Sequence, residues 1–111
     1  MLRQALAATF VVVGMCGSAI AADPAHVERL RTTNACVSCN LTGADLTRVN
    51  LTGANLSGAD LTNANLSDAN LAGANLAGAN LRGADMSFTR LCNTLMPDGT
   101  INYADCWRES R

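Results

Sequence analysis

Apolar residues recur at every fifth position through the middle of the chain. This period matches neither the roughly 3.6 residues per turn of an α-helix nor the two-residue alternation of a strand. A second column of mostly small residues stands two positions before the first, and it consists of Ala44, Val49, Ala54, Ala59, Ala64, Ala69, Ala74, Ala79, Ala84 and Thr89. The first column is the expected core ladder, and it consists of Leu41, Leu46, Leu51, Leu56, Leu61, Leu66, Leu71, Leu76, Leu81, Met86 and Leu91.

Each five-residue unit predicts a short strand followed by a turn. Ala54 and Leu56 are two residues apart, which places their side chains on the same face of an extended chain. The next residues, Ser57 and Gly58, are small or polar and therefore typical of turns. Because every turn must return the next pair to the same interior, the chain is expected to coil around an axis. A helix is excluded, since a period of five would spread leucine around its whole circumference.

The repeated pattern A-[D/N]-L-x-x resembles the pentapeptide-repeat family from about Cys39 to Met96. The resemblance implies an all-β fold, a right-handed quadrilateral β-helix with four units per coil and, in this chain, just under three coils. The flanking stretches C-x-x-C-[D/N]-L and L-C-N-T-x-M-P-D-G-x-I-N further resemble an exported bacterial subgroup of that family.

Both ends of so short a coil would expose apolar interior and unpaired strand edges, so caps are expected. Asp23-Pro24 is a favourable helix start, and Val27 and Leu30 lie on one face of that helix. A turn is predicted at Met96-Pro97-Asp98-Gly99. The expected organisation is a signal peptide at 1–21, an N-terminal helical cap at 22–38, the β-helix at 39–96 and a C-terminal lid with a disulfide at 97–111.

The N-terminal segment has the features of a signal peptide. A basic residue, Arg3, precedes an apolar run at about 5–14, and Ala19-Ile20-Ala21 fits a cleavage site between Ala21 and Ala22. The apolar run is too short to span a bilayer permanently. A periplasmic or secreted protein is therefore predicted, and the alternative is an uncleaved hydrophobic anchor.

Charge argues against a nucleic-acid partner. After cleavage, seven arginines and no lysine would face nine acidic residues, a net charge of −2, without the basic patch that nucleic-acid binding needs. The resemblance also raises a DNA-mimicking, topoisomerase-binding role, but such mimicry needs a dense anionic face. The repeats disfavour it, because their charged residues are Asp45, Asp60, Asp68 and Asp85 against Arg48, Arg82 and Arg90.

Four cysteines follow the predicted cleavage site, and an even number in a small exported protein predicts disulfides. On the twenty-residue coil that the resemblance implies, Cys36 and Cys92 are nearly three coils apart, roughly 13 Å along the axis. A disulfide joins Cα atoms within about 7 Å, and a single zinc site is smaller still. The pairs Cys36–Cys39 and Cys92–Cys106 are therefore predicted.

The Cys36/Cys39 pair is the most suggestive candidate for chemistry. Thiol–disulfide exchange needs a thiolate stabilised by a helix N-terminus or a positive charge, whereas this motif follows a helix. A structural staple is favoured, and a redox role is the alternative.

Nothing else in the sequence indicates an enzyme. His26 is the single histidine and is expected to be solvated, and the aspartates lie on a regular surface instead of converging in a cleft. No catalytic, cofactor-binding or metal-binding residues and no cofactor are predicted. The expected function is a non-enzymatic structural or protein-interaction module. Its flat polar sides would meet an unidentified protein partner, with no nucleic acid and no membrane span after signal removal.

Overall fold

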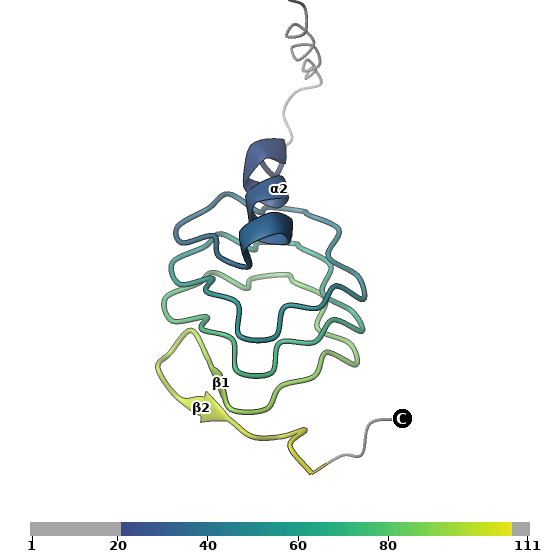
Figure 1. Ribbon diagram of the computed structural model, residues 1–111, viewed down its shortest axis with the longest axis vertical. Coiled ribbons are helices and arrows are strands. Elements are labelled where there is room, and N and C mark those ends of the chain that lie inside the picture. Colours follow the sequence, from purple (N-terminus) through teal and green to yellow (C-terminus); the bar gives the residue numbers. More distant parts are fainter. Residues whose placement is uncertain (1–20, 108–111) are drawn as a thin grey trace, which may run out of the picture.

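The computed structural model describes residues 21–107; the predicted signal peptide, except for its last residue, lies outside this range. The described elements are one helix, α2 (Pro24–Thr33), and two short strands, β1 (Thr94–Leu95) and β2 (Ile101–Asn102). Between α2 and β1 the chain winds in stacked coils (Figure 1). Parallel bridges join residues twenty apart, from Ala35↔Asn55 to Asn75↔Leu95. This ladder begins at Ala35, so the segment expected as the N-terminal cap contains the first side of the coil.

The five-residue period arises from the corners of the coil. Every fifth residue from Ser38 to Asn93 has a positive φ. At a typical corner Gly43 has φ +68° and the N–H of Ala44 donates to the carbonyl of Leu41 at 3.0 Å, which is a type II turn. Five residues per corner and twenty per coil make four sides. Glycine fills half of the twelve corner positions because it adopts positive φ without steric cost.

Neighbouring coils are joined through their backbones. The N–H of Leu56 donates to Asn75 O, and the N–H of Asn75 donates back to Ala54 O, each at 2.8 Å. The corners pair as well, since Gly58 N–H donates to Ala77 O at 2.8 Å. Neighbouring coils are therefore held together by direct hydrogen bonds between their backbones.

The apolar column fills the interior of the coil. From Leu41 to Leu76 every leucine of this column is at most 1% exposed. Leu81, Met86 and Leu91 are only partly buried. They belong to the last turn of the coil, and no further coil lies beneath them to cover their side chains.

Helix α2 lies over the first coil (Figure 1). It begins at the predicted residue, with the Asp23 carboxylate accepting from Ala25 N–H at 3.0 Å and Pro24 in the first turn. Leu30 is buried in the core, and Val27 packs against it. Among residues 21–107 there is no helix long and apolar enough to cross a membrane.

The C-terminal segment folds back beneath the last coil. Strands β1 and β2 pair antiparallel, with Thr94 opposite Asn102. Farther on, Asp105 N–H donates to Leu91 O at 2.9 Å. The segment therefore runs under the side of the coil that contains Leu91 (Figure 1).

The strain of a positive φ at the corners predicts opposite effects of two substitutions on stability. Arg48 has φ +61° and an exposed side chain, so Arg48→Gly is expected to raise the free energy of unfolding by about 1 kcal/mol. Gly53 has φ +71° with no atom within 4 Å of an added Cβ, so Gly53→Ala should lower it by about 1 kcal/mol through strain alone. Denaturant unfolding measures both. Equal effects of the same sign would contradict the strain explanation.

Candidate functional site

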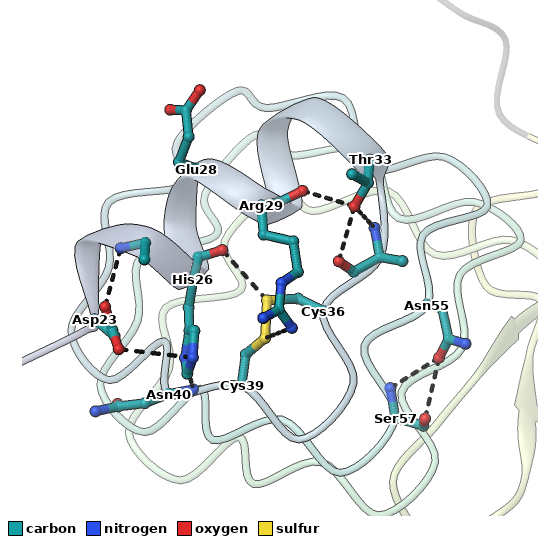
Figure 2. The surroundings of a disulfide bond; sticks show 12 residues. Asp23, His26, Glu28, Arg29, Thr33, Cys36, Cys39, Asn40, Asn55 and Ser57 are labelled. Carbon is teal, nitrogen blue, oxygen red and sulfur yellow. Dashed lines mark hydrogen bonds and ion pairs between the residues drawn. A yellow bond between two sulfur atoms is a disulfide. The ribbon is translucent and has the colours of Figure 1, made fainter.

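The Cys36–Cys39 disulfide lies at the first turn of the coil, directly beneath α2 (Figure 2). The two cysteines are bonded with a Cα–Cα distance of 5.3 Å, and their side chains are 0% and 2% exposed. The N–H of Cys36 donates to Asn55 O, as Leu56 N–H does to Asn75 O one coil later, so Cys36 continues the leucine column. Cys39 stands two residues before Leu41 and occupies an alanine position. Both sulfurs therefore lie in the core.

His26 connects α2 to the edge of the first coil. Its Nδ1 accepts a hydrogen bond from Asn40 N–H at 2.9 Å (Figure 2). The N–H of Asp23 donates to Asn40 O at 3.0 Å. The prediction of a solvated His26 is wrong, because the ring is half-buried and serves as an acceptor for the backbone. Its other nitrogen, Nε2, lies 3.6 Å from the Asp23 carboxylate. The helix thus bonds both backbone groups of Asn40.

Arg29 places a positive charge beside the disulfide. Its Nη1 lies 3.7 Å from Cys39 Sγ (Figure 2). This contact was not predicted, because Arg29 lies ten residues before Cys39 and the motif was considered only as following a helix. A guanidinium stabilises a thiolate at Cys39, but the core position of both sulfurs limits access by a reductant.

A second disulfide joins Cys92 to Cys106, with a Cα–Cα distance of 4.7 Å and a sequence separation of 14. It links the last turn of the coil to the segment that runs beneath it. Asp105 reinforces this link, since its Oδ2 accepts from Leu91 N–H at 3.0 Å. The two disulfides therefore lie at opposite ends of the solenoid.

The outward aspartates and asparagines have a structural role that sequence reasoning did not assign. At a typical corner Asp45 Oδ1 accepts from both the N–H and the hydroxyl of Thr47, at 3.1 and 2.6 Å. Asn50 and Thr52 repeat this geometry, and where alanine replaces the hydroxyl residue, as at Ala72, the N–H bond to Asn70 remains. The signal was visible in the sequence as Asx-Leu-Thr/Ser at each repeat. Side chains of this type stabilise turns by bonding the backbone two residues on.

These hydrogen bonds also lower the pKa values of the aspartates that accept them. The hydroxyl of the following Thr or Ser, and then its backbone N–H, hold the pKa of each of four exposed carboxyl groups below the usual range: Asp45, Asp60, Asp85 and Asp98. A carboxyl whose pKa is lower in the folded state stabilises the fold above its unfolded pKa, about 3.9 for aspartate. That contribution is lost as the pH falls through the folded pKa.

Acid is therefore expected to weaken the fold through these four turns. A variant carrying Asn at all four positions should unfold at nearly the same denaturant concentration at pH 7 and pH 3, because asparagine keeps the accepting Oδ1, as Asn50 does. The unsubstituted protein should lose stability over that range. Asp68→Asn is the control, since no hydrogen bond to its carboxylate comes from the described residues. A variant as acid-sensitive as the unsubstituted protein would contradict the assignment.

The stack separates the acidic residues from one another. Asp60 lies between Asn40 and Asn80, and Asn65 lies between Asp45 and Asp85. No bridge within residues 21–107 pairs two acids, so the described sides form no continuous anionic column. That same part of the chain contains no group of three or more His, Cys, Asp or Glu side chains able to hold a metal ion.

Comparison with known proteins supports the repeat assignment. A family model described as pentapeptide repeats, in eight copies, matches residues 36–68 and 59–96, together more than half of the 111 residues. No curated protein matches the chain.

Solved structures of three cyanobacterial pentapeptide-repeat proteins are similar. HetL, involved in heterocyst differentiation regulation in Nostoc sp. strain PCC 7120, is 42% identical over 61% of this chain and 34% of its own, with a TM-score of 0.33. Rfr23 from Cyanothece 51142 is 23% identical over 70% and 97%, with a TM-score of 0.32. The protein alr5209 from Nostoc PCC 7120 is 27% identical over 66% and 78%, with a TM-score of 0.37. The chain therefore spans about a third of the length of HetL.

Proposed function

The chain belongs to the pentapeptide-repeat family, whose right-handed quadrilateral β-helices are generally non-enzymatic structural or interaction modules, and we propose that it is an exported module of just under three coils that binds a protein partner. In this proposal α2 caps the first coil and residues 97–107 cap the last one. Leu30 in the core and the two bonds from α2 to Asn40 support the first cap. The Cys92–Cys106 disulfide supports the second.

The observation that carries the proposed function is a pair of neighbouring asparagine columns. Asn50 bridges Asn70 on one side of the coil, and Asn55 bridges Asn75 on the next. Each Oδ1 accepts from the N–H two residues on, which fixes the side chain. The Nδ2 donors of all four have no partner among the described residues. They form a rigid, uncharged array with the strand spacing of about 4.8 Å, which suits the carbonyl oxygens of a protein partner.

Site-specific photo-crosslinking tests the binding surface. A photoreactive residue at Asn50 or Asn55 should yield a discrete cross-linked protein in living cells, whereas the same residue at Asp45 or Asp60, on the other two sides, should not. All four positions are exposed and lie at equivalent places in their repeats, so the second pair is a matched control. An absence of cross-links at both asparagine positions would contradict the proposal.

Export is supported by the predicted cleavage site and by the cysteines. All four cysteines beyond residue 22 are paired, as is usual for small proteins in oxidising compartments. N-terminal sequencing of the protein from its native cells should begin at Ala22, in the exported fraction. A chain that begins at Met1 in the cytoplasmic fraction would contradict export.

A redox function is the second candidate, and the Arg29 guanidinium beside Cys39 favours it. A thiolate of a dithiol reductant would attack Cys36 Sγ and form a mixed disulfide, while Cys39 leaves as a thiolate stabilised by Arg29. The second thiol of the reductant would then release Cys36. The reductant becomes a disulfide, and the two protons and two electrons pass to Cys36 and Cys39.

Alkylation trapping separates the two candidates. If cysteines are redox-active, a substantial fraction of Cys36 and Cys39 should be reduced in cells while Cys92–Cys106 is closed, and Arg29→Gln should lower the reduction potential of the first pair. If both pairs are fully oxidised under all growth conditions, the first disulfide is a staple and the redox candidate is rejected.

A further inference from the structure

Residues 21–26 take the place of a missing coil on one side of the first turn. Within the stack, both backbone groups of an outward residue such as Asp60 bond to the coil before it. Asn40 has no coil before it. Instead, His26 Nδ1 accepts from its N–H at 2.9 Å (Figure 2), and its carbonyl accepts from Asp23 N–H at 3.0 Å. The segment therefore completes the side of the coil that contains Asn40.

This pairing is confined to the side that contains Asn40. The N–H groups of Asp45 and Asn50, at the same place on the next two sides, have no partner among the described residues. Two further contacts strengthen the pairing. The side-chain Nδ2 of Asn40 donates to Ala21 O at 3.2 Å, and the partly buried Ala22 packs against the core. The predicted cleavage site is therefore part of the docked segment.

Asp23 fixes the chain immediately after that cleavage site. Its N–H bonds to the first coil, and its carbonyl accepts from the N–H groups of His26 and Val27 at 2.9 and 3.0 Å. Its carboxylate accepts from Ala25 N–H at 3.0 Å and so begins α2. The peptide bond at the cleavage site is therefore held from both sides, by Asp23 after it and by Asn40 at the carbonyl before it.

We propose that docking of residues 21–26 on the first coil protects the Ala21–Ala22 bond from cleavage, so that the predicted leader, residues 1–21, must be removed before the cap folds. This inference rests on the proposed export. A chain that folded first would keep its apolar leader.

The chemistry of cleavage explains the protection. Water adds its hydroxyl to the carbonyl carbon of Ala21 and a proton to the amine of Ala22, which takes a second proton from the new carboxyl group. A protease stabilises the transition state by donating hydrogen bonds to the oxygen of the carbonyl under attack. In the folded chain that oxygen already accepts from Asn40 Nδ2, and the segment must leave the coil to be bound. Proteolysis then follows the population of the locally opened state.

Cleavage removes only one hydrogen bond of the cap. The cleaved chain loses Ala21 and with it the acceptor of Asn40 Nδ2. It keeps the bonds from His26 and Asp23 to the backbone of Asn40, and it keeps Ala22 against the core. The cap therefore forms on the cleaved chain as well. The order of cleavage and docking decides whether the folded protein carries its leader.

Limited proteolysis of the full chain tests the protection. Elastase has a small specificity pocket that accepts alanine, and mass spectrometry measures the product that begins at Ala22. The folded, oxidised chain should be cut there slowly. His26→Leu removes the acceptor of the Asn40 N–H and should speed the cut by roughly tenfold or more, because it favours the opened state. Reduction and alkylation of Cys36 and Cys39, whose enlarged side chains no longer fit the core, should have the same effect without a substitution.

Two variants serve as controls. In His26→Asn the side-chain Oδ1 takes the place of the imidazole Nδ1 as acceptor, so this variant should keep the protection. Leu81→Ala weakens the opposite end of the molecule and should also leave the cut slow. A native chain cut as fast as the alkylated one, or equal rates for His26→Leu and His26→Asn, would overturn the proposal. Export is tested separately by the N-terminal sequence from native cells, and a start at Met1 there would contradict export while the resistance to elastase stands.

Discussion

Replacing Leu61 with alanine is expected to lower the free energy of unfolding by about 2 to 5 kcal/mol, the usual cost of deleting a fully buried leucine. Leu61 is 0% exposed and lies in the middle coil, between Leu41 above and Leu81 below. The coil cannot collapse around the gap, because backbone hydrogen bonds to both neighbouring coils fix the position of its sides: Leu61 N–H donates to Asn80 O, and Asp60 N–H donates to Cys39 O. Denaturant unfolding measures the change.

The same substitution at Leu81 is the matched control. Leu81 belongs to the same column but is only partly buried in the last turn, so Leu81→Ala should cost less than half as much. In a solenoid each repeat contacts only its neighbours, and the two costs therefore report the number of neighbouring coils. Equal costs at both positions would show that stacking does not govern stability here.

The core was predictable because its pattern is strictly local. Each side of the coil repeats the same two inward positions, so burial leaves a period of five in the sequence, as at Ala54 and Leu56. The corners were predictable for the same reason. A type II turn requires positive φ at every fifth residue, and glycine is frequent at these positions. Arg48 and Phe88 also occupy corners with positive φ, but neither residue type indicates a left-handed conformation by itself. Only the phase of the surrounding repeats places them there.

The site around the first disulfide depends on packing that has no period. His26 bonds the backbone of Asn40, fourteen residues away, and Arg29 approaches Cys39 because α2 crosses the coil at one particular angle. A sequence pattern gives the helix and its apolar face but not this angle. The N–H groups of Leu81 and Met86 have no partner among the described residues, whereas those of Leu61 and Leu66 one coil earlier are bonded. This difference was likewise not predicted, because the repeat pattern is the same in both coils. The contacts at both ends therefore lie outside the repeat pattern.

Breaking the Cys92–Cys106 disulfide is expected to lower the free energy of unfolding by about 3 kcal/mol. In the chain-entropy description a cross-link that closes a loop of about 15 residues restricts the unfolded chain by this amount, and the two cysteines are 14 residues apart. The measurement is denaturant unfolding of the variant Cys92→Ala, Cys106→Ala. Either single substitution should cost nearly as much as the double one, because each abolishes the link.

Amide exchange locates the effect within the molecule. Loss of the link should speed exchange at Asp105, whose N–H donates to Leu91 O, and leave Asn40, bonded to His26 beneath α2, unchanged. If the double variant keeps full stability, the hydrogen bonds of Asp105 and the β1–β2 pair are sufficient to hold the segment in place, and the disulfide is not needed for it.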